Sequence, residues 1–134
     1  MPKIPEVRAS QALFSVRARL KSFTFAGRGL RWLVTDEHNA WLHVAASLLA
    51  TAAGLLLQIS VSDWRWLVSA IATVWLAEAF NTAIENLCDR ISPEFDTAIG
   101  RIKDLSAGGV LIASITAALI GLLTLVPPLL ARVL

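Results

Sequence analysis

Three long apolar stretches dominate the sequence, at about 41–59, 64–87 and 105–130. Each is close to the roughly 20 residues that an α-helix needs to cross a hydrocarbon core about 30 Å thick. The pattern therefore predicts three transmembrane helices. Buried core helices of a soluble protein are the alternative, but three of them in 134 residues leave too little polar chain to cover them.

The polar segments between these stretches predict how the helices connect. The first connector, Ser60–Asp63, is so short that the first two helices must run antiparallel. The second, 88–104, is longer and highly polar, so a loop outside the membrane is expected there, with a turn or helix start at Ser92-Pro93. Pro127 and Pro128 are expected to end the third helix.

The segment before the first span, about 10–33, mixes apolar and basic residues. Leu13, Val16, Leu20 and Phe23 recur at helical spacing, which predicts an amphipathic helix lying in the membrane interface. A basic arm that binds nucleic acid is the alternative. The leucine and phenylalanine content, and the spans that follow, favour an anionic lipid surface, so no nucleic-acid partner is expected.

Composition and charge support a membrane protein and predict its orientation. The chain is 56% hydrophobic and 16% charged, with a mean hydropathy of +0.65, whereas soluble domains average roughly 25% charged residues. Residues 1–35 hold seven Lys or Arg and one acid, the 88–104 loop holds three cations, and the other side holds only two. The positive-inside rule therefore predicts a cytoplasmic N-terminus and a cytoplasmic 88–104 loop.

Two smaller features of the sequence concern disulfide bonds and membrane insertion. The single cysteine, Cys88, excludes an internal disulfide. No cleavable signal peptide is expected, because the N-terminal segment has no uninterrupted apolar run. Membrane insertion is therefore expected to depend on the three apolar helices themselves.

Four polar residues share one face of the second span. At 100° per residue, Asn81, Glu85 and Asp89 lie within about 60° of Glu78. An acid within a span costs about 2.5–3.5 kcal/mol on insertion scales, so a row of them needs a compensating cation, metal or proton. We predict a metal and catalytic site near the cytoplasmic interface, because carboxylate and amide oxygens are ligands that Mg²⁺ accepts. A structural polar seam and an ion or proton pathway are the alternatives.

Further polar residues fall on the same side of the membrane. Glu37 lies just before the first span, and Lys103 and Asp104 lie just before the third. Carboxylates together with a lysine suit a Mg²⁺–nucleotide, with one carboxylate taking the proton from an attacking hydroxyl. The Walker A and protein-kinase motifs are missing. Spacing alone therefore indicates a metal-dependent membrane enzyme and leaves the donor unnamed.

Two motifs carry a resemblance to a known family. The second span reads EAFNTAIENLCD from Glu78 to Asp89, and RIKDLSAG follows from Arg101 to Gly108. This pattern resembles the bacterial diacylglycerol kinase and undecaprenol kinase family, which are small membrane lipid kinases unrelated to soluble kinases. Weaker similarity extends over nearly all the chain after about residue 12.

The resemblance implies an all-α homotrimer in the bacterial inner membrane, with composite active sites that use MgATP to phosphorylate a lipid hydroxyl. Glu78 is then expected to be the general base and to contact the lipid together with Asn81. The Mg²⁺ ligands are expected to be Glu37 and Glu85. The nucleotide contacts that the resemblance implies come from Lys103, Asp104, Glu85, Asp89, Asn81 and Arg19, with Arg17 as the alternative to Arg19.

Three features within the resemblance concern the substrate. Asn81–Asn86 and Ser92–Phe95 look more like the undecaprenol kinase branch, and His43 stands where the diacylglycerol-specific branch usually has an acid. Undecaprenol is therefore favoured over diacylglycerol. A non-catalytic membrane assembly protein and a small ion or proton transporter are the alternative functions.

Overall fold

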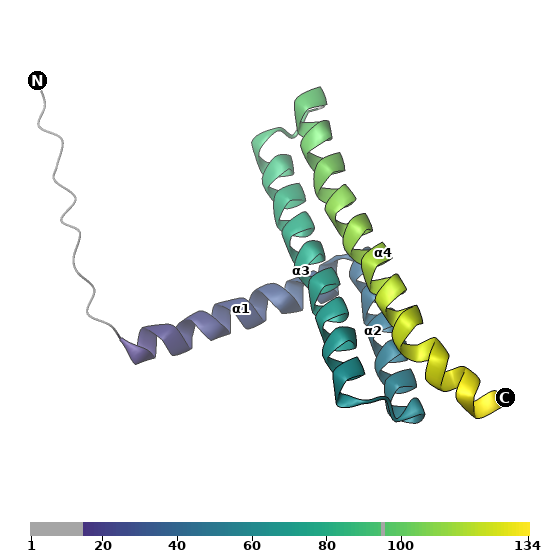
Figure 1. Ribbon diagram of the computed structural model, residues 1–134. Coiled ribbons are helices and arrows are strands. Elements are labelled where there is room, and N and C mark those ends of the chain that lie inside the picture. The colour runs from purple at the N-terminus through teal and green to yellow at the C-terminus, as the bar shows by residue number, and fades with distance from the viewer. Residues whose placement is uncertain (1–14, 95) are drawn as a thin grey trace, which may run out of the picture.

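The computed structural model describes residues 15–94 and 96–134, and this part of the chain is built from four α-helices. They are α1 (Val16–Asp36), α2 (His38–Leu57), α3 (Val61–Ile91) and α4 (Thr97–Val133). Helices α2, α3 and α4 run alongside one another, whereas α1 runs across this bundle (Figure 1). The prediction of an all-α protein with an N-terminal helix and three long apolar helices is confirmed.

Helices α2, α3 and α4 are each long and apolar enough to cross a membrane. Their outer faces expose many large apolar side chains, among them Leu49 at 72%, Leu105 at 80% and Leu123 at 78%. Apolar surface on this scale is rare on soluble monomers and is stable in contact with lipid. The chain is therefore a membrane protein.

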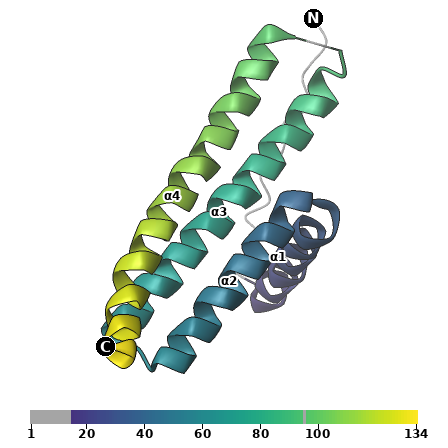
Figure 2. The ribbon, with the colours of Figure 1, turned by 90° about the vertical axis from the view of Figure 1, so that its right-hand side faces the viewer.

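Helix α3 is the most enclosed of the three. In its apolar part 28% of the residues are buried inside the protein, against 11% in α2 and in α4. Its buried positions follow one stripe of the helix: Leu67, Ala70, Val74, Glu78, Asn81 and Cys88. Helix α4 packs along most of its length, and α2 packs beside its first half (Figure 2).

The connection from α2 to α3 is tight, as the short SVSD segment predicts. Gln58 adopts a left-handed conformation with φ 52°, and its backbone N–H donates to a carbonyl of the last turn of α2. Ser60 and Asp63 then form a capping box at the start of α3, each side chain accepting from the other's backbone N–H. Gly54 lies so close to the Trp64 ring that a Cβ there would approach it to 3.0 Å. The two helices are therefore antiparallel and in close contact.

The predicted 88–104 loop is mostly helical, so that prediction is wrong in its extent. Helix α3 continues to Ile91 and α4 begins at Thr97, which leaves 92–96 as the connector. Asp96 caps α4 by accepting from the N–H groups of Ala98 and Ile99. Polar composition limits which part of a helix can lie in hydrocarbon, but it does not end the helix, because a helix that is already formed extends into water with one further backbone hydrogen bond per residue.

The prediction that Pro127-Pro128 ends the third span is also wrong, since both prolines lie inside α4. Each proline removes one backbone donor, but the helix resumes and runs to Val133. One turn beyond the prolines, the Arg132 guanidinium donates to the carbonyls of Leu56 and Leu57 at the end of α2. This contact holds the last turns of α4 against the bundle.

The N-terminal helix differs from its predicted bounds of 10–33. Ser15 is not helical, α1 begins at Val16, and the helix runs on to Asp36; residues 10–14 lie outside the described part of the chain. Glu37 is the single extended residue between α1 and α2. From this junction the last turns of α3 and the first turns of α4 project beyond the level of α1 (Figure 2).

Candidate active site

Glu78 lies near the middle of α3 and is the most enclosed acid in the described part of the chain, with 2% of its surface exposed. Its Oε2 lies 3.6 Å from Nε2 of His43 on α2. This is longer than a hydrogen bond but within the range of an ion pair. Sequence periodicity placed Glu78 and Asn81 on one face of this helix, and in the structure both are buried, together with Val74 and Ala70 of the preceding turns.

His43 is the site residue whose contact the sequence reasoning missed. Its ring packs edge-on against Trp75 at 6.3 Å between centroids, and the Trp75 indole N–H donates to Oγ of Ser47 at 3.1 Å. These contacts fix the imidazole beside Glu78. The signal was available: His43 is the only ionisable residue in the apolar stretch 41–59.

Asn81 is buried one turn after Glu78, with 7% of its surface exposed. Its Oδ1 is buried and accepts no hydrogen bond within the described residues. A buried carbonyl oxygen without a partner costs roughly 1–3 kcal/mol, which favours a donor or a cation supplied from outside this chain. Glu85, a further turn on, is half-buried.

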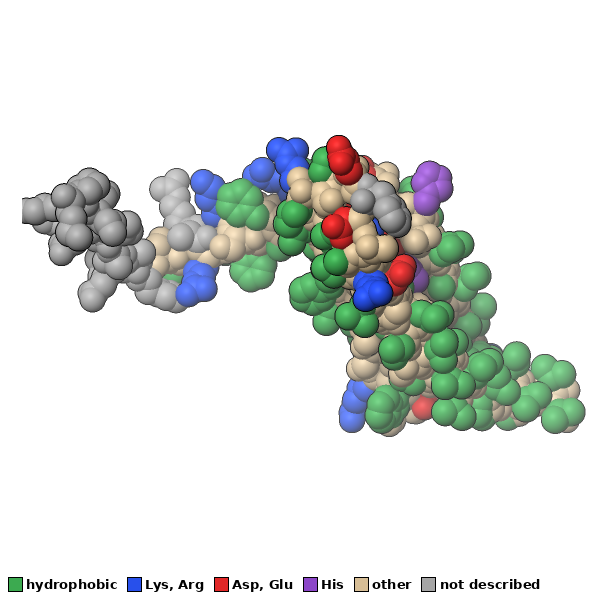
Figure 3. All heavy atoms as spheres, turned by 90° about the horizontal axis from the view of Figure 1, so that it is seen from above, with side chains coloured by type: hydrophobic (Ala, Val, Ile, Leu, Met, Phe, Trp, Pro, Cys, Tyr) green, Lys and Arg blue, Asp and Glu red, His purple; other side chains and the backbone are tan. Residues whose placement is uncertain are grey.

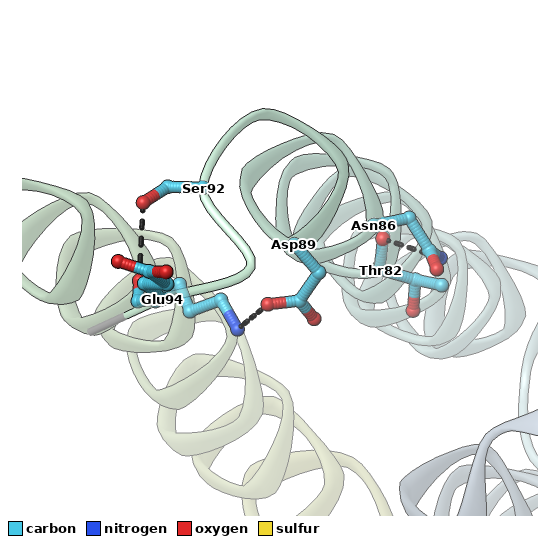
Figure 4. A network of polar contacts seen from close by, with 6 residues as sticks. Thr82, Asn86, Asp89, Ser92 and Glu94 are labelled. Atoms are coloured by element: carbon cyan, nitrogen blue, oxygen red, sulfur yellow. Dashed lines mark hydrogen bonds and ion pairs between the residues drawn. The ribbon is translucent and has the colours of Figure 1, made fainter. Parts of the chain in front are cut away.

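Asp89 and Lys103 pair across the top of the α3–α4 hairpin. The Lys103 ammonium donates to Oδ1 of Asp89 (Figure 4). Lys103 lies on α4 just before the predicted span 105–130. The hydrogen bond to Asp89 is the main reason that the pKa of Lys103 lies above its usual value. The side chain is therefore a fixed cation at this end of the molecule.

A groove with a volume of about 780 Å³ opens between α1 and α3. Its polar lining comes from Asp36, Glu37, Thr82 and Asn86, and most of the remainder is apolar surface of α1. Glu37 is the N-cap residue of α2, yet its side chain makes no capping hydrogen bond. Its carboxylate is therefore available to a ligand in the groove.

The structure gathers some of the predicted site residues but not all. Glu85 does not line the groove that Glu37 lines. Within residues 15–94 and 96–134, no group of three or more His, Cys, Asp or Glu side chains is close enough to hold a metal ion. Arg19 lies in the first turn of α1 and Asp104 is exposed on α4. The described part of one chain therefore does not gather the predicted ligands into one metal site.

Most of the acidic side chains lie at one end of the bundle. Seen from the end where α3 and α4 project, acidic side chains gather over the bundle and cationic ones follow α1 (Figure 3). Apolar side chains cover the sides of the bundle in the same view. The polar side chains thus lie at one end of the bundle, above three apolar helices, and a catalytic site is expected at this end.

Several known proteins are similar to this chain in sequence. The family model for prokaryotic diacylglycerol kinase matches residues 24–125. The chain belongs to this family. It is 33% identical over 109 residues to the undecaprenol kinase of Bacillus subtilis, covering 81% of this chain and 89% of that protein. It is also 33% identical over 98 residues to the diacylglycerol kinase of Escherichia coli K12, covering 73% and 80%, and 30% identical over 113 residues to that of Synechocystis, covering 84% and 65%.

Membership in this kinase family makes the chain a membrane lipid kinase. The matched region includes the α1–α2 junction, the acidic face of α3 and the start of α4, while Arg19 precedes it. The family prediction made from the EAFNTAIENLCD and RIKDLSAG motifs is confirmed. The roles of individual residues stay predictions.

Proposed function

We propose that this lipid kinase transfers the γ-phosphoryl group of ATP to the hydroxyl of a membrane lipid alcohol, with undecaprenol favoured over diacylglycerol. One observation carries the proposal: Glu78 is a buried acid near the middle of a membrane-spanning helix, held beside an imidazole. A carboxylate in such a site is costly to keep, and acids retained within a span mark functional sites by default.

Glu78 is the proposed general base. It takes the proton from the lipid hydroxyl as the lipid oxygen forms a bond to the γ-phosphorus of ATP. The bond between that phosphorus and the bridging oxygen breaks, and ADP leaves. Because phosphoryl transfer depends mainly on positioning and charge stabilisation, a base fixed on a rigid helix suits the reaction.

The donor chemistry of this site fits Mg²⁺. Carboxylate and amide oxygens are its preferred protein ligands, and the orphaned Oδ1 of Asn81 and the uncapped carboxylate of Glu37 are of this kind. Glu37 and Glu85 would hold the ion, with Asn81 in support. Bound there with ATP, Mg²⁺ would neutralise charge on the phosphate oxygens.

The proposed nucleotide contacts lie on the projecting end of the hairpin. Lys103 is a fixed cation beside Asp89, suited to phosphate oxygens, and Asp104 is exposed on the next position of α4. Glu85 and Asp89 lie near the same end of α3, and in this proposal Arg19 of α1 also contacts the nucleotide. ATP would therefore enter from the aqueous side, while the lipid stays in the bilayer.

A homotrimer with shared sites is the proposed assembly. In one copy, Glu37 lines the groove beside α1 and Glu85 does not, and no three potential ligands of the described residues come together. A neighbouring copy would bring the proposed ligands together. The proposed location is the bacterial inner membrane, with the N-terminus in the cytoplasm, and no nucleic-acid partner is proposed.

The experiment that tests this function is a transfer assay. Purified protein in lipid micelles is given Mg²⁺ and γ-labelled ATP together with either undecaprenol or diacylglycerol. Label is expected in extracted lipid, with a larger kcat/KM for undecaprenol. Absence of label in both lipids contradicts the proposed function, and a larger kcat/KM for diacylglycerol contradicts the substrate choice.

A further inference from the structure

An apolar cavity with a volume of about 200 Å³ lies between α2, α3 and α4. Its walls are made largely of small and aliphatic side chains, including Ala46, Ala50, Ala70, Val74 and Ala117. His43 lines one end of it. No Lys or Arg lines the cavity, so a triphosphate has no partner there, whereas a hydrocarbon chain does.

The polar end of this cavity is a pair of side chains from two helices. His43 lines the cavity and contacts Glu78 at 3.6 Å between Nε2 and Oε2. Within the described residues, no Lys or Arg side chain lies within 4.0 Å of Glu78, so His43 is its one ion-pairing neighbour there. Only 17% of the His43 side chain and 3% of the Glu78 side chain are exposed.

The imidazole itself is held by a further contact. Trp75 packs edge-on against His43, and Ser47 accepts the Trp75 indole N–H. Ser47 lies one turn after His43 on α2, and Trp75 lies one turn before Glu78 on α3. The four residues thus tie α2 to α3 at the level of the proposed base.

We propose that His43 is a positioning residue for phosphoryl transfer, and that it holds Glu78 at the polar end of an apolar cavity that takes the first carbons of the lipid alcohol, next to its hydroxyl. This inference rests on the proposed function. A lipid alcohol in the cavity has its hydroxyl beside the carboxylate and its first carbons among alanines, leucine and valine. The groove between α1 and α3, whose polar lining includes Glu37 and Asn86, is left to the metal side.

The first test replaces His43. In His43→Leu, Glu78 loses its fixed neighbour, and kcat is expected to fall roughly 100-fold, the scale of a 1 Å misplacement, while KM for ATP stays unchanged. In His43→Gln, an amide N–H is retained, and most of the lost kcat is expected to return. The control is His38→Leu, because His38 is exposed at the start of α2. Wild-type kcat in His43→Leu, or equal losses in the Leu and Gln variants, overturns the positioning role.

The second test fills the cavity without touching the polar pair. Ala117→Leu adds bulk to the α4 wall, and KM for the lipid is expected to rise about tenfold or more, with KM for ATP unchanged. Ala52→Leu, on the exposed face of α2, is the matched control. Equal lipid KM values in the two variants overturn the lipid subsite.

Elution in detergent distinguishes a loss of activity from a loss of folded protein, and wild-type activity distinguishes failure of this inference from failure of the proposed function. Each variant is first shown to elute as the wild type does in detergent, and Ala117→Leu is replaced by Ala50→Leu if it does not. A wild type that labels neither lipid refutes the proposed function as a whole. An active wild type with unaffected His43 and Ala117 variants refutes this inference alone.

Discussion

A carboxylate in an apolar helix is stable only where its surroundings compensate it. Glu78 is buried, and within the described residues His43 on α2 is the ion-pairing side chain beside it. Placing an acid at the centre of a span costs about 2.5–3.5 kcal/mol. A nearby imidazole and a polar ligand together reduce this cost, whereas lipid does not. Glu78 thus affects both the stability of α3 in the membrane and the proposed phosphoryl transfer.

Glu85, unlike Glu78, is a predicted Mg²⁺ ligand. In Glu85→Gln, one proposed Mg²⁺ ligand loses its charge, and the Mg²⁺ concentration for half-maximal activity is expected to rise about tenfold, equivalent to about 1.4 kcal/mol. The measurement is a Mg²⁺ titration of lipid phosphorylation at saturating ATP, with Glu94→Gln, the same chemical change on the exposed connector, as the control. An unaltered titration contradicts the role of Glu85 as a ligand.

For single residues, the sequence predicts the helix face on which a side chain lies better than it predicts the residues of other helices that contact it. Helical spacing placed Glu78 and Asn81 on one side of α3, and both are buried there. It could not identify His43 as the neighbour of Glu78, because spacing within one helix carries no information about the register of another. Likewise, Asn81 was selected, but its orphaned oxygen follows only from the packing of α3 in three dimensions.

At the scale of helices, hydropathy predicts what lies in lipid and not where a helix ends. The predicted spans 64–87 and 105–130 are the apolar parts of longer helices, Val61–Ile91 and Thr97–Val133. The extra turns are polar and carry Asp89 and Lys103. Local capping determines the true ends: Asp96 begins α4, and the Ser60–Asp63 capping box begins α3. Polar composition therefore suggested a loop where two helices project.

The capping box of α3 is directly testable. Ser60→Ala removes the oxygen that accepts the Asp63 N–H, and a loss of about 1 kcal/mol in the free energy of unfolding is expected. The measurement is an unfolding titration with denaturing detergent in mixed micelles. Ser62→Ala, which changes an exposed serine within the first turn, is the control and is expected to retain wild-type stability. Equal stability of Ser60→Ala and the control contradicts the capping role.

At the scale of the whole molecule, one end carries the chemistry and the other end holds the helices together. Acidic side chains gather at the projecting end (Figure 3), where Lys103 pairs with Asp89 and where the proposed nucleotide would bind. At the opposite end, the Arg132 guanidinium donates to Leu56 at 2.6 Å and to Leu57 at 2.9 Å. These contacts satisfy carbonyls that the end of α2 leaves free and favour a cation there.

Arg132 is accordingly expected to stabilise the bundle without affecting catalysis directly. In Arg132→Ala, the free energy of unfolding is expected to fall by about 1 kcal/mol, because two hydrogen bonds to α2 are lost at an exposed site. The same micelle titration measures it, and Arg65→Ala, an exposed arginine at the same end, is the control. A variant as stable as Arg65→Ala contradicts this role for Arg132.

The most direct measurement concerns the buried acid itself. Glu78→Gln keeps the shape of the side chain and removes its ability to accept a proton, so kcat for lipid phosphorylation is expected to fall at least about 100-fold, with KM for ATP little changed. Glu94→Gln, on the exposed connector, makes the same chemical change and is expected to retain wild-type kcat. A Glu78→Gln enzyme that labels lipid at the wild-type rate contradicts the account.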